Sequence, residues 1–144
     1  NEDCARQLFP RVDQAIIVLV HKDDRCLLGS QAQWPEGRIS TIAGFVEPGE
    51  SLEDAERREV YEETNVSDGS IAYHSSQPWP FPSSLMLGFV AEATTTDIEL
   101  HDGELEEARW FTRDELLSGS RKLPFQISIA RRLVDHWINL GDTA

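Results

Sequence analysis

The sequence is poor in cysteine, in basic residues and in long apolar runs, and each shortage excludes a class of protein. Two cysteines, Cys4 and Cys26, cannot build a disulfide framework, which favours a reducing, intracellular compartment. The chain has 13 basic against 26 acidic residues and a net charge of -13, which argues against a basic surface for nucleic-acid backbones or membranes. No apolar run approaches the roughly 20 residues of a membrane-spanning helix, so we expect no membrane partner.

The composition is that of one globular domain. Hydrophobic residues make up 40% of the chain and charged residues 27%, and 144 residues suffice for a sizeable core. Apolar runs predict strands, and apolar residues at helical spacing predict helices. The expected order is three strands (14–20, 26–29, 39–43), a helix (52–64), two strands (70–74, 85–93) and two helices (from 112 and from 127).

The stretch 44–66 carries the clearest chemical pattern. Its glycines and proline predict a loop, and Ser51 is a good N-cap for the helix that follows. The helix face that holds its apolar residues also holds four glutamates, Glu56, Glu59, Glu62 and Glu63. Carboxylates turned toward a core are costly unless they are paired or bind a metal, and clustered oxygens suit Mg2+ or Mn2+. The alternative is a solvated acidic helix with internal ion pairs, such as Arg58 to Glu62.

The spacing of these residues resembles the Nudix box of the diphosphate-hydrolase superfamily. Gly44 is followed after five residues by Glu50, and after seven more by Arg58-Glu59-Val60-Tyr61-Glu62-Glu63. The resemblance implies the α+β Nudix fold, a mixed β-sheet between α-helices, with Arg58, Glu59, Glu62 and Glu63 as catalytic residues. It implies that the three glutamates hold the ion, and that Glu62 or Glu63 takes a proton. Asn65 replaces the usual Gly, and we expect it to preserve the left-handed helix cap.

A second informative stretch covers residues 75–84. Three prolines at alternating positions predict an extended loop, and the aromatic residues between them suit stacking on a flat base. The alternative is a proline-rich surface loop or a partner-binding segment. The run Ser76-Gln77-Pro78-Trp79-Pro80-Phe81-Pro82 resembles a motif of the NADH pyrophosphatase subfamily. That resemblance implies that Gln77, Trp79 and Phe81 bind substrate and that the loop closes the pocket, across the interface of a homodimer.

Three more positions gain a role from this resemblance. Phe45 is similar to the family's stacking partner for the substrate's base, although a core phenylalanine is the alternative. Glu104 matches an acidic residue that joins the metal site. Ala130 resembles a small residue at the substrate pocket.

Cys4 also gains an interpretation. Family members commonly carry a four-cysteine zinc ribbon before the catalytic domain, and Cys4 resembles its last cysteine. One cysteine cannot hold zinc, which needs about four ligands. We therefore interpret residues 1–11 as the remnant of a ribbon linker and 12–144 as the Nudix catalytic domain, with zinc expected only in the missing ribbon.

The predicted reaction is metal-dependent hydrolysis of the diphosphate bond of NAD(H), giving nicotinamide mononucleotide and AMP. Other substrates that fit are ADP-ribose, diadenosine polyphosphate and the 5′ end of NAD-capped RNA. The alternative of another class is a module that senses NAD without hydrolysing it. The intact run from Arg58 to Glu63 disfavours that alternative, because a sensor need not keep mutually repelling carboxylates.

Overall fold

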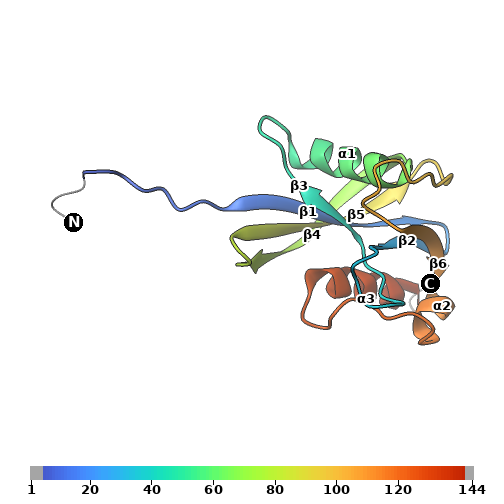
Figure 1. Cartoon of the computed structure of the whole chain (residues 1–144). Coiled ribbons are helices and arrows are strands. Elements are labelled where there is room, and N and C mark those ends of the chain that lie inside the picture. The colour runs from blue at the N-terminus through green and yellow to red at the C-terminus, as the bar shows by residue number, and fades with distance from the viewer. Residues whose placement is uncertain (1–4, 142–144) are drawn as a thin grey trace.

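The computed structural model describes residues 5–141, so the expectation for Cys4 lies outside it. A six-stranded mixed sheet lies between α1 on one side and α2 with α3 on the other (Figure 1). This arrangement confirms the expected mixed sheet between helices. The elements are β1 (Asp13–Lys22), β2 (Arg25–Ser30), β3 (Ile42–Phe45), α1 (Leu52–Thr64), β4 (Asp68–Trp79), β5 (Ser84–Ala93), β6 (Glu107–Thr112), α2 (Arg113–Leu117) and α3 (Ile129–Gly141).

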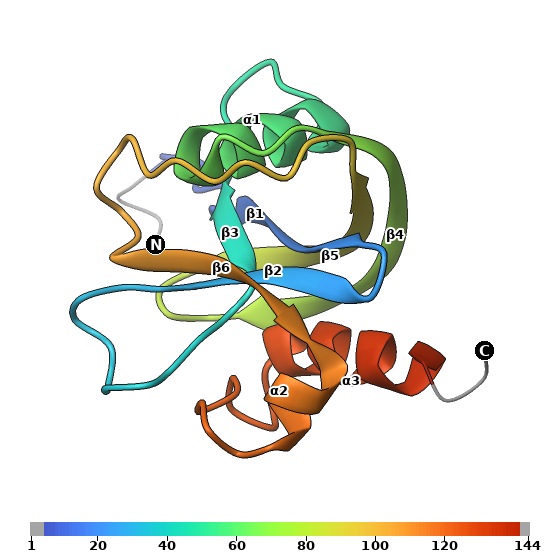
Figure 2. The same cartoon turned by 90° about the vertical axis from the view of Figure 1, so that its right-hand side faces the viewer.

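The centre of the sheet is β1, which explains its unbroken apolar sequence. The strand order is β4-β5-β1-β2-β6, with β3 also paired to β1 (Figure 2). Alternate β1 residues such as Ile16 and Val18 join the cluster under α1, while Ile17 and Leu19 join the cluster under α3. A strand covered on both faces needs apolar residues at successive positions, as the sequence has here.

The strands differ from expectation in three places. The predicted loop at 75–84 is wrong in its first half, because β4 continues through Pro78 to Trp79 and pairs with β5. Since β4 is the terminal strand of the sheet, proline there removes no needed hydrogen bond. The strand β6 was not predicted, although its Phe111 is fully buried. The expected strand at 39–43 is displaced, because β3 starts only at Ile42.

The last helix is also displaced. Ile127, expected on its apolar stripe, is 79% exposed and precedes α3. The start of α3 is bracketed by the side chain of Gln77, which donates to the Ile127 carbonyl and accepts from the Ile129 amide, each at 2.8 Å. None of the helices within residues 5–141 has the length and apolarity to cross a membrane.

The helix α1 begins and ends where the sequence predicts. Ser51 Oγ accepts a hydrogen bond from the Asp54 amide at 3.1 Å. Asn65 adopts the left-handed conformation, with φ 66° and ψ 3°, and its amide donates to the Tyr61 carbonyl. Its side chain also donates to the Asp97 carbonyl at 3.2 Å. Asn65 therefore ends α1 as the usual glycine would.

Asn65→Ala is expected to lower the free energy of unfolding by about 1–2 kcal/mol, because alanine has a Cβ that is strained in this conformation and lacks the short polar side chain by which asparagine tolerates it. Asn65→Gly accepts the conformation and loses the same side-chain hydrogen bond, so it serves as the matched control. Chemical denaturation of both variants measures the difference. Equal losses in the two variants would assign the effect to the side-chain bond and contradict the prediction.

Candidate active site

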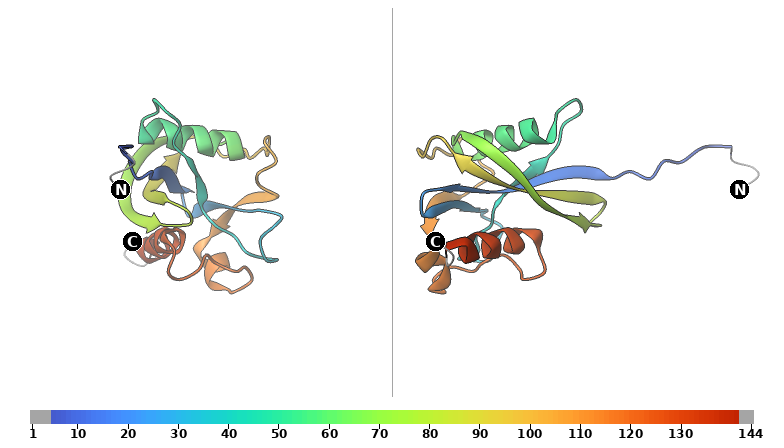
Figure 3. Two further views of the ribbon diagram at one scale, coloured as in Figure 1. Left: turned by 60° about the vertical axis from the view of Figure 1, so that its left-hand side comes forward. Right: turned by 180° about the vertical axis from the view of Figure 1, so that it is seen from behind.

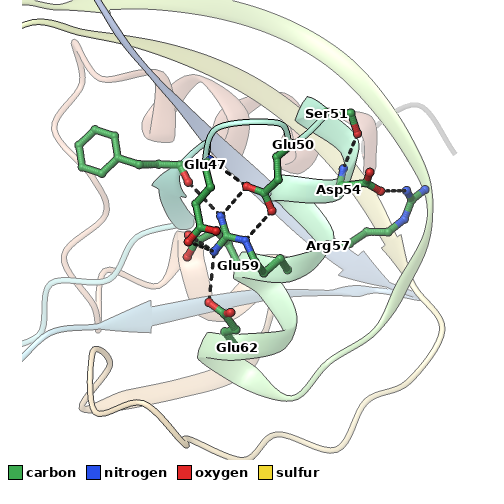
Figure 4. A network of polar contacts seen from close by, with 9 residues as sticks. Glu47, Glu50, Ser51, Asp54, Arg57, Glu59 and Glu62 are labelled. Carbon is green, nitrogen blue, oxygen red and sulfur yellow. Dashed lines mark hydrogen bonds and ion pairs between the residues drawn. The ribbon is translucent and has the colours of Figure 1, made fainter.

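Arg58 joins the loop before α1 to the helix itself, through its ion pairs with Glu50, Glu59 and Glu62, three residues labelled in Figure 4. Its guanidinium donates to both carboxylate oxygens of Glu50, at 2.6 and 2.8 Å, and to the Phe45 carbonyl at 3.0 Å. It also donates to Glu59 at 2.8 Å and to Glu62 at 3.2 Å. The hydrogen bond from Arg58 lowers the pKa of Glu50 to about 2, so this pair stays ionised. A two-pronged arginine–carboxylate pair is geometrically rigid, and it fixes the loop relative to α1.

Three of the predicted metal ligands come together beside this network. One carboxylate oxygen each from Glu59, Glu63 and Glu104 lies within 4.8 Å of the others. Glu63 is 3% exposed, and its burial, followed by its contact with Glu104, raises its pKa to about 9. Burial also raises the pKa of Glu59. Three clustered carboxylates, of which Glu59 and Glu63 resist ionisation without a counter-charge, fit a hard divalent cation such as Mg2+ or Mn2+.

The fourth predicted ligand, Glu62, lies outside this group of three. Its side chain is 53% exposed and pairs with Arg58. The ion pair from Arg58 to Glu62, weighed as the alternative for the helix, is therefore present, while Glu59 and Glu63 turn inward. One helix thus carries two environments for neighbouring glutamates, and the position around the helix separates them.

The strand β3 is close enough to α1 that one position must be glycine. A Cβ on Gly44 would overlap the carboxyl group of Glu59. Gly44 is paired with Ile16, which faces α1, whereas Phe45 is paired with Ala15 and lies on the other face of the sheet. The absence of a side chain at Gly44 therefore leaves room for the Glu59 carboxylate.

Glu104 reaches the site because the segment after β5 runs along α1 (Figure 2). The Glu99 amide donates to the Thr64 carbonyl at 3.0 Å, which ties this segment to the end of α1. Next to Glu104, Leu105 is buried in the cluster under α1. Glu104 itself is exposed, so the carboxylate group is open to solvent on this side.

The predicted substrate residues lie on the other side of β3. Gln77, Trp79 and Ala130 line one cavity of about 150 Å3 together with Ile17, Met86, Ser128 and Ile129. The amide of Gln77 is already bonded to the start of α3, so Gln77 shapes this cavity through the helix that it brackets. Phe81 is 72% exposed and stacks edge-on against Trp79, with ring centroids 5.4 Å apart.

Phe45 lies on the same face of the sheet as this cavity. It aligns across β1 with Met86, because Ala15 pairs with both residues. Phe45 is 60% exposed, so the alternative of a core phenylalanine is wrong. It lines a hollow of about 220 Å3 with Arg11, Asp13, Gln14 and Val46.

A neighbouring cavity was missed by sequence reasoning. It measures about 200 Å3, shares Ser128 and Ala130 with the first, and is otherwise lined by Trp34, Pro35, Arg38, Ser40, Pro124 and Phe125. The Arg38 guanidinium lies 4.1 Å from the centroid of the Phe125 ring. The only available signal was a pair of Pro-flanked aromatic residues in two separate loops, and nothing in the sequence indicates that these loops meet.

A mixed sheet between helices, with a carboxylate-lined helix after a glycine loop, defines the class of Nudix-fold proteins. The chain belongs to the NUDIX domain family, whose model matches residues 10–135. In the solved structure of a NUDIX hydrolase from Nitrosomonas europaea, the same fold covers 99% of this chain and 78% of that one, with a TM-score of 0.76 and 19% identity.

Sequence relatives confirm the subfamily resemblance. The chain is 45% identical over 142 residues to human "NAD-capped RNA hydrolase NUDT12", covering 92% of this chain and 31% of that protein. It is 46% identical over 151 residues to "NAD-capped RNA hydrolase NudC" of Mycobacterium bovis, covering 95% and 48%. It is also 48% identical over 123 residues to "Nudix hydrolase 19, chloroplastic" of Arabidopsis thaliana, covering 81% and 28%. The chain therefore spans less than half the length of each of these relatives.

Binding of Mg2+ or Mn2+ is expected to stabilise the chain through the three clustered carboxylates. At about 100 times the dissociation constant, the ion should raise the free energy of unfolding by about 2.7 kcal/mol. Glu63→Gln should raise that dissociation constant at least about tenfold. Glu106→Gln, an exposed change in the same segment as Glu104, is the control and should not alter it. Calorimetric titration measures both, and equal affinities in the two variants would contradict the assignment.

Proposed function

We propose that the chain is the catalytic domain of a metal-dependent diphosphatase that hydrolyses NAD(H) to nicotinamide mononucleotide and AMP. The observation that carries this proposal is the convergence of Glu59, Glu63 and Glu104. Buried acids whose ionisation is opposed by their surroundings are a feature of reaction sites, and here they lie beside a glycine loop. The names of the full-length relatives support an NAD-containing substrate.

In the proposed mechanism, a bound divalent ion would offset the charge of the diphosphate and lower the pKa of the attacking water. Glu59, Glu63 and Glu104 would hold the ion, and Arg58 would keep the loop and helix in register. Of the two candidates for the base, we favour Glu63, because it lies inside the cluster while Glu62 faces solvent against Arg58. Glu62, at the exposed edge of the site, then adds negative charge near the ion without holding it.

We place the two parts of the substrate on opposite sides of β3. We place the diphosphate on the α1 side, beside the carboxylates of Glu59, Glu63 and Glu104, where exposed Glu104 leaves the group open to solvent. A base enters the apolar cavity beside Trp79 and Ala130, on the α3 side, with the exposed ring of Phe45 available for stacking. Exposed Trp79 and Phe81 at the end of the β4–β5 hairpin support closure of the site by a second copy in a homodimer.

The 5′ end of NAD-capped RNA is the second candidate substrate. Relatives named NAD-capped RNA hydrolase share 44–47% identity with this chain and favour it. The net charge of -13 disfavours broad contact with an RNA backbone, so recognition would centre on the NAD end. ADP-ribose and diadenosine polyphosphate also contain a bond between two phosphates and remain test substrates. The proposed site of action is a reducing, intracellular compartment.

We also propose that residues 1–11 are a linker and that residues 12–144 form the catalytic domain. Within the described part of the linker, Leu8 and Phe9 are 80% and 84% exposed, and this segment extends away from the sheet (Figure 3). The sheet itself starts at Asp13.

Incubation with NADH and Mn2+, followed by chromatography, tests the proposed reaction. We expect AMP and reduced nicotinamide mononucleotide, with both products lost on addition of EDTA. Glu63→Gln should lower kcat by about 10²–10⁴-fold while the folded structure remains. Glu106→Gln is again the control and should keep the wild-type rate.

Each outcome decides between the candidate functions. Unchanged kcat in folded Glu63→Gln would contradict the assignment of this residue. NADH binding without products would favour the sensing module over the enzyme. Faster cleavage of NAD-capped RNA than of NADH, at equal concentration, would make the capped end the preferred substrate.

A further inference from the structure

A fourth acid on the buried face of α1 lies apart from the three clustered carboxylates. Glu56 is fully buried, with 0% of its surface exposed, and neither of its carboxyl oxygens has a hydrogen-bond partner among the described residues. Asp68, the first residue of β4, is in the same situation, because both of its carboxyl oxygens are inaccessible and unpartnered in the described chain. Residues 5–141 thus enclose two carboxyl groups and offer neither of them a hydrogen-bond donor.

The neighbouring cation does not supply that donor. Arg57 is exposed, and its guanidinium donates to the Gly69 carbonyl at 3.4 Å and pairs with Asp54 at 3.9 Å. Two buried carboxylates without a donor would repel each other and would both lack solvation. A protonated carboxyl group, in contrast, is itself a donor to a neighbouring carboxylate.

We propose that Glu56 and Asp68 form a proton-binding site, in which one proton shared between the two carboxyl groups fastens α1 to the start of β4. The proton converts four orphaned acceptors into one donor and three acceptors, and it leaves the pair with a single negative charge. The interaction links two elements directly, since Glu56 lies in the second turn of α1 and its side chain interacts with that of Asp68, the first residue of β4.

The electrostatic surroundings agree with this assignment. Burial raises the pKa of Glu56, and the adjacent Asp68 raises it further. On α1 the other charge that acts on Glu56 is Arg57, which lowers its pKa, and on β4 it is Asp68. The geometric source of the shift is the contact between α1 and β4, where ionisation of both acids would place two like charges on oxygens that bulk solvent does not reach.

The shared proton makes folding depend on pH in a definite direction. Unfolded Glu56 ionises at its ordinary pKa of about 4.3, whereas the folded pair keeps its proton to higher pH. The folded state therefore binds more protons than the unfolded state above that pH, and stability falls as the pH rises. Between the two pKa values, the folding equilibrium constant contributed by this pair falls about tenfold per pH unit.

Glu56→Gln tests the shared proton, because glutamine supplies a permanent N–H donor of the same shape. We expect denaturant unfolding of the wild-type chain to show a folding equilibrium constant that declines from about pH 5 upward. In Glu56→Gln the contribution of this pair to the decline, a factor of about ten per pH unit, should be absent. The variant should therefore be more stable than the wild type at alkaline pH. Glu53→Gln, an exposed change on the same helix, is the matched control and should keep the wild-type pH profile.

Carbon-13 NMR of the glutamate side chains gives a reading that does not depend on a variant's stability. The glutamate carboxyl signal that disappears in Glu56→Gln is assigned to Glu56. In the wild type we expect this signal to be that of a protonated acid at neutral pH. A Glu56 signal that titrates with the exposed glutamates would overturn the proposal. So would a Glu56→Gln profile that coincides with that of the wild type.

Discussion

The burial of carboxyl groups on the inner face of α1 is the constraint on which this structure depends. Glu56 and Glu63 are 0% and 3% exposed although each carries an ionisable group. Folding cannot leave such groups charged and unsolvated without a large cost. The surrounding elements add to that cost. The missing side chain of Gly44 leaves room for a further carboxylate, that of Glu59, and the segment after β5 places Glu104 beside Glu63.

Arg58 holds several of the charged side chains around α1 in fixed positions. Its guanidinium is shared among Glu50, Glu59 and Glu62, so it orients all three but cannot neutralise the cluster. Its contact with Glu50 is the closest of these, at 2.6 Å, and fixes the loop. Within residues 5–141 Glu63 has no ion pair with an arginine or lysine, so a cation beside Glu104 would be needed to offset its charge.

The sequence predicted the local features of the fold and site better than the contacts between distant segments. Capping by Ser51 and the left-handed Asn65 follow from short-range rules, and both are found. The strand β6 is stabilised mainly by its pairing with β2, far away in the chain, so its own six residues show little of it. The cavity between Trp34 and Phe125 was missed for the same reason, since two separate loops build it.

The helical period also concealed a distinction between glutamates that share a face. Glu63 meets Glu104, which is exposed, so a ligand from solvent can reach the group that they form. The side chain of Glu56 interacts with that of Asp68, and the carboxyl oxygens of both are closed to solvent, so an ion from solvent would have to open this contact to enter. A proton is small enough to be enclosed where a hydrated divalent ion is not. Access, rather than residue type, therefore decides that one buried acid of α1 is suited to a metal and the other to a proton.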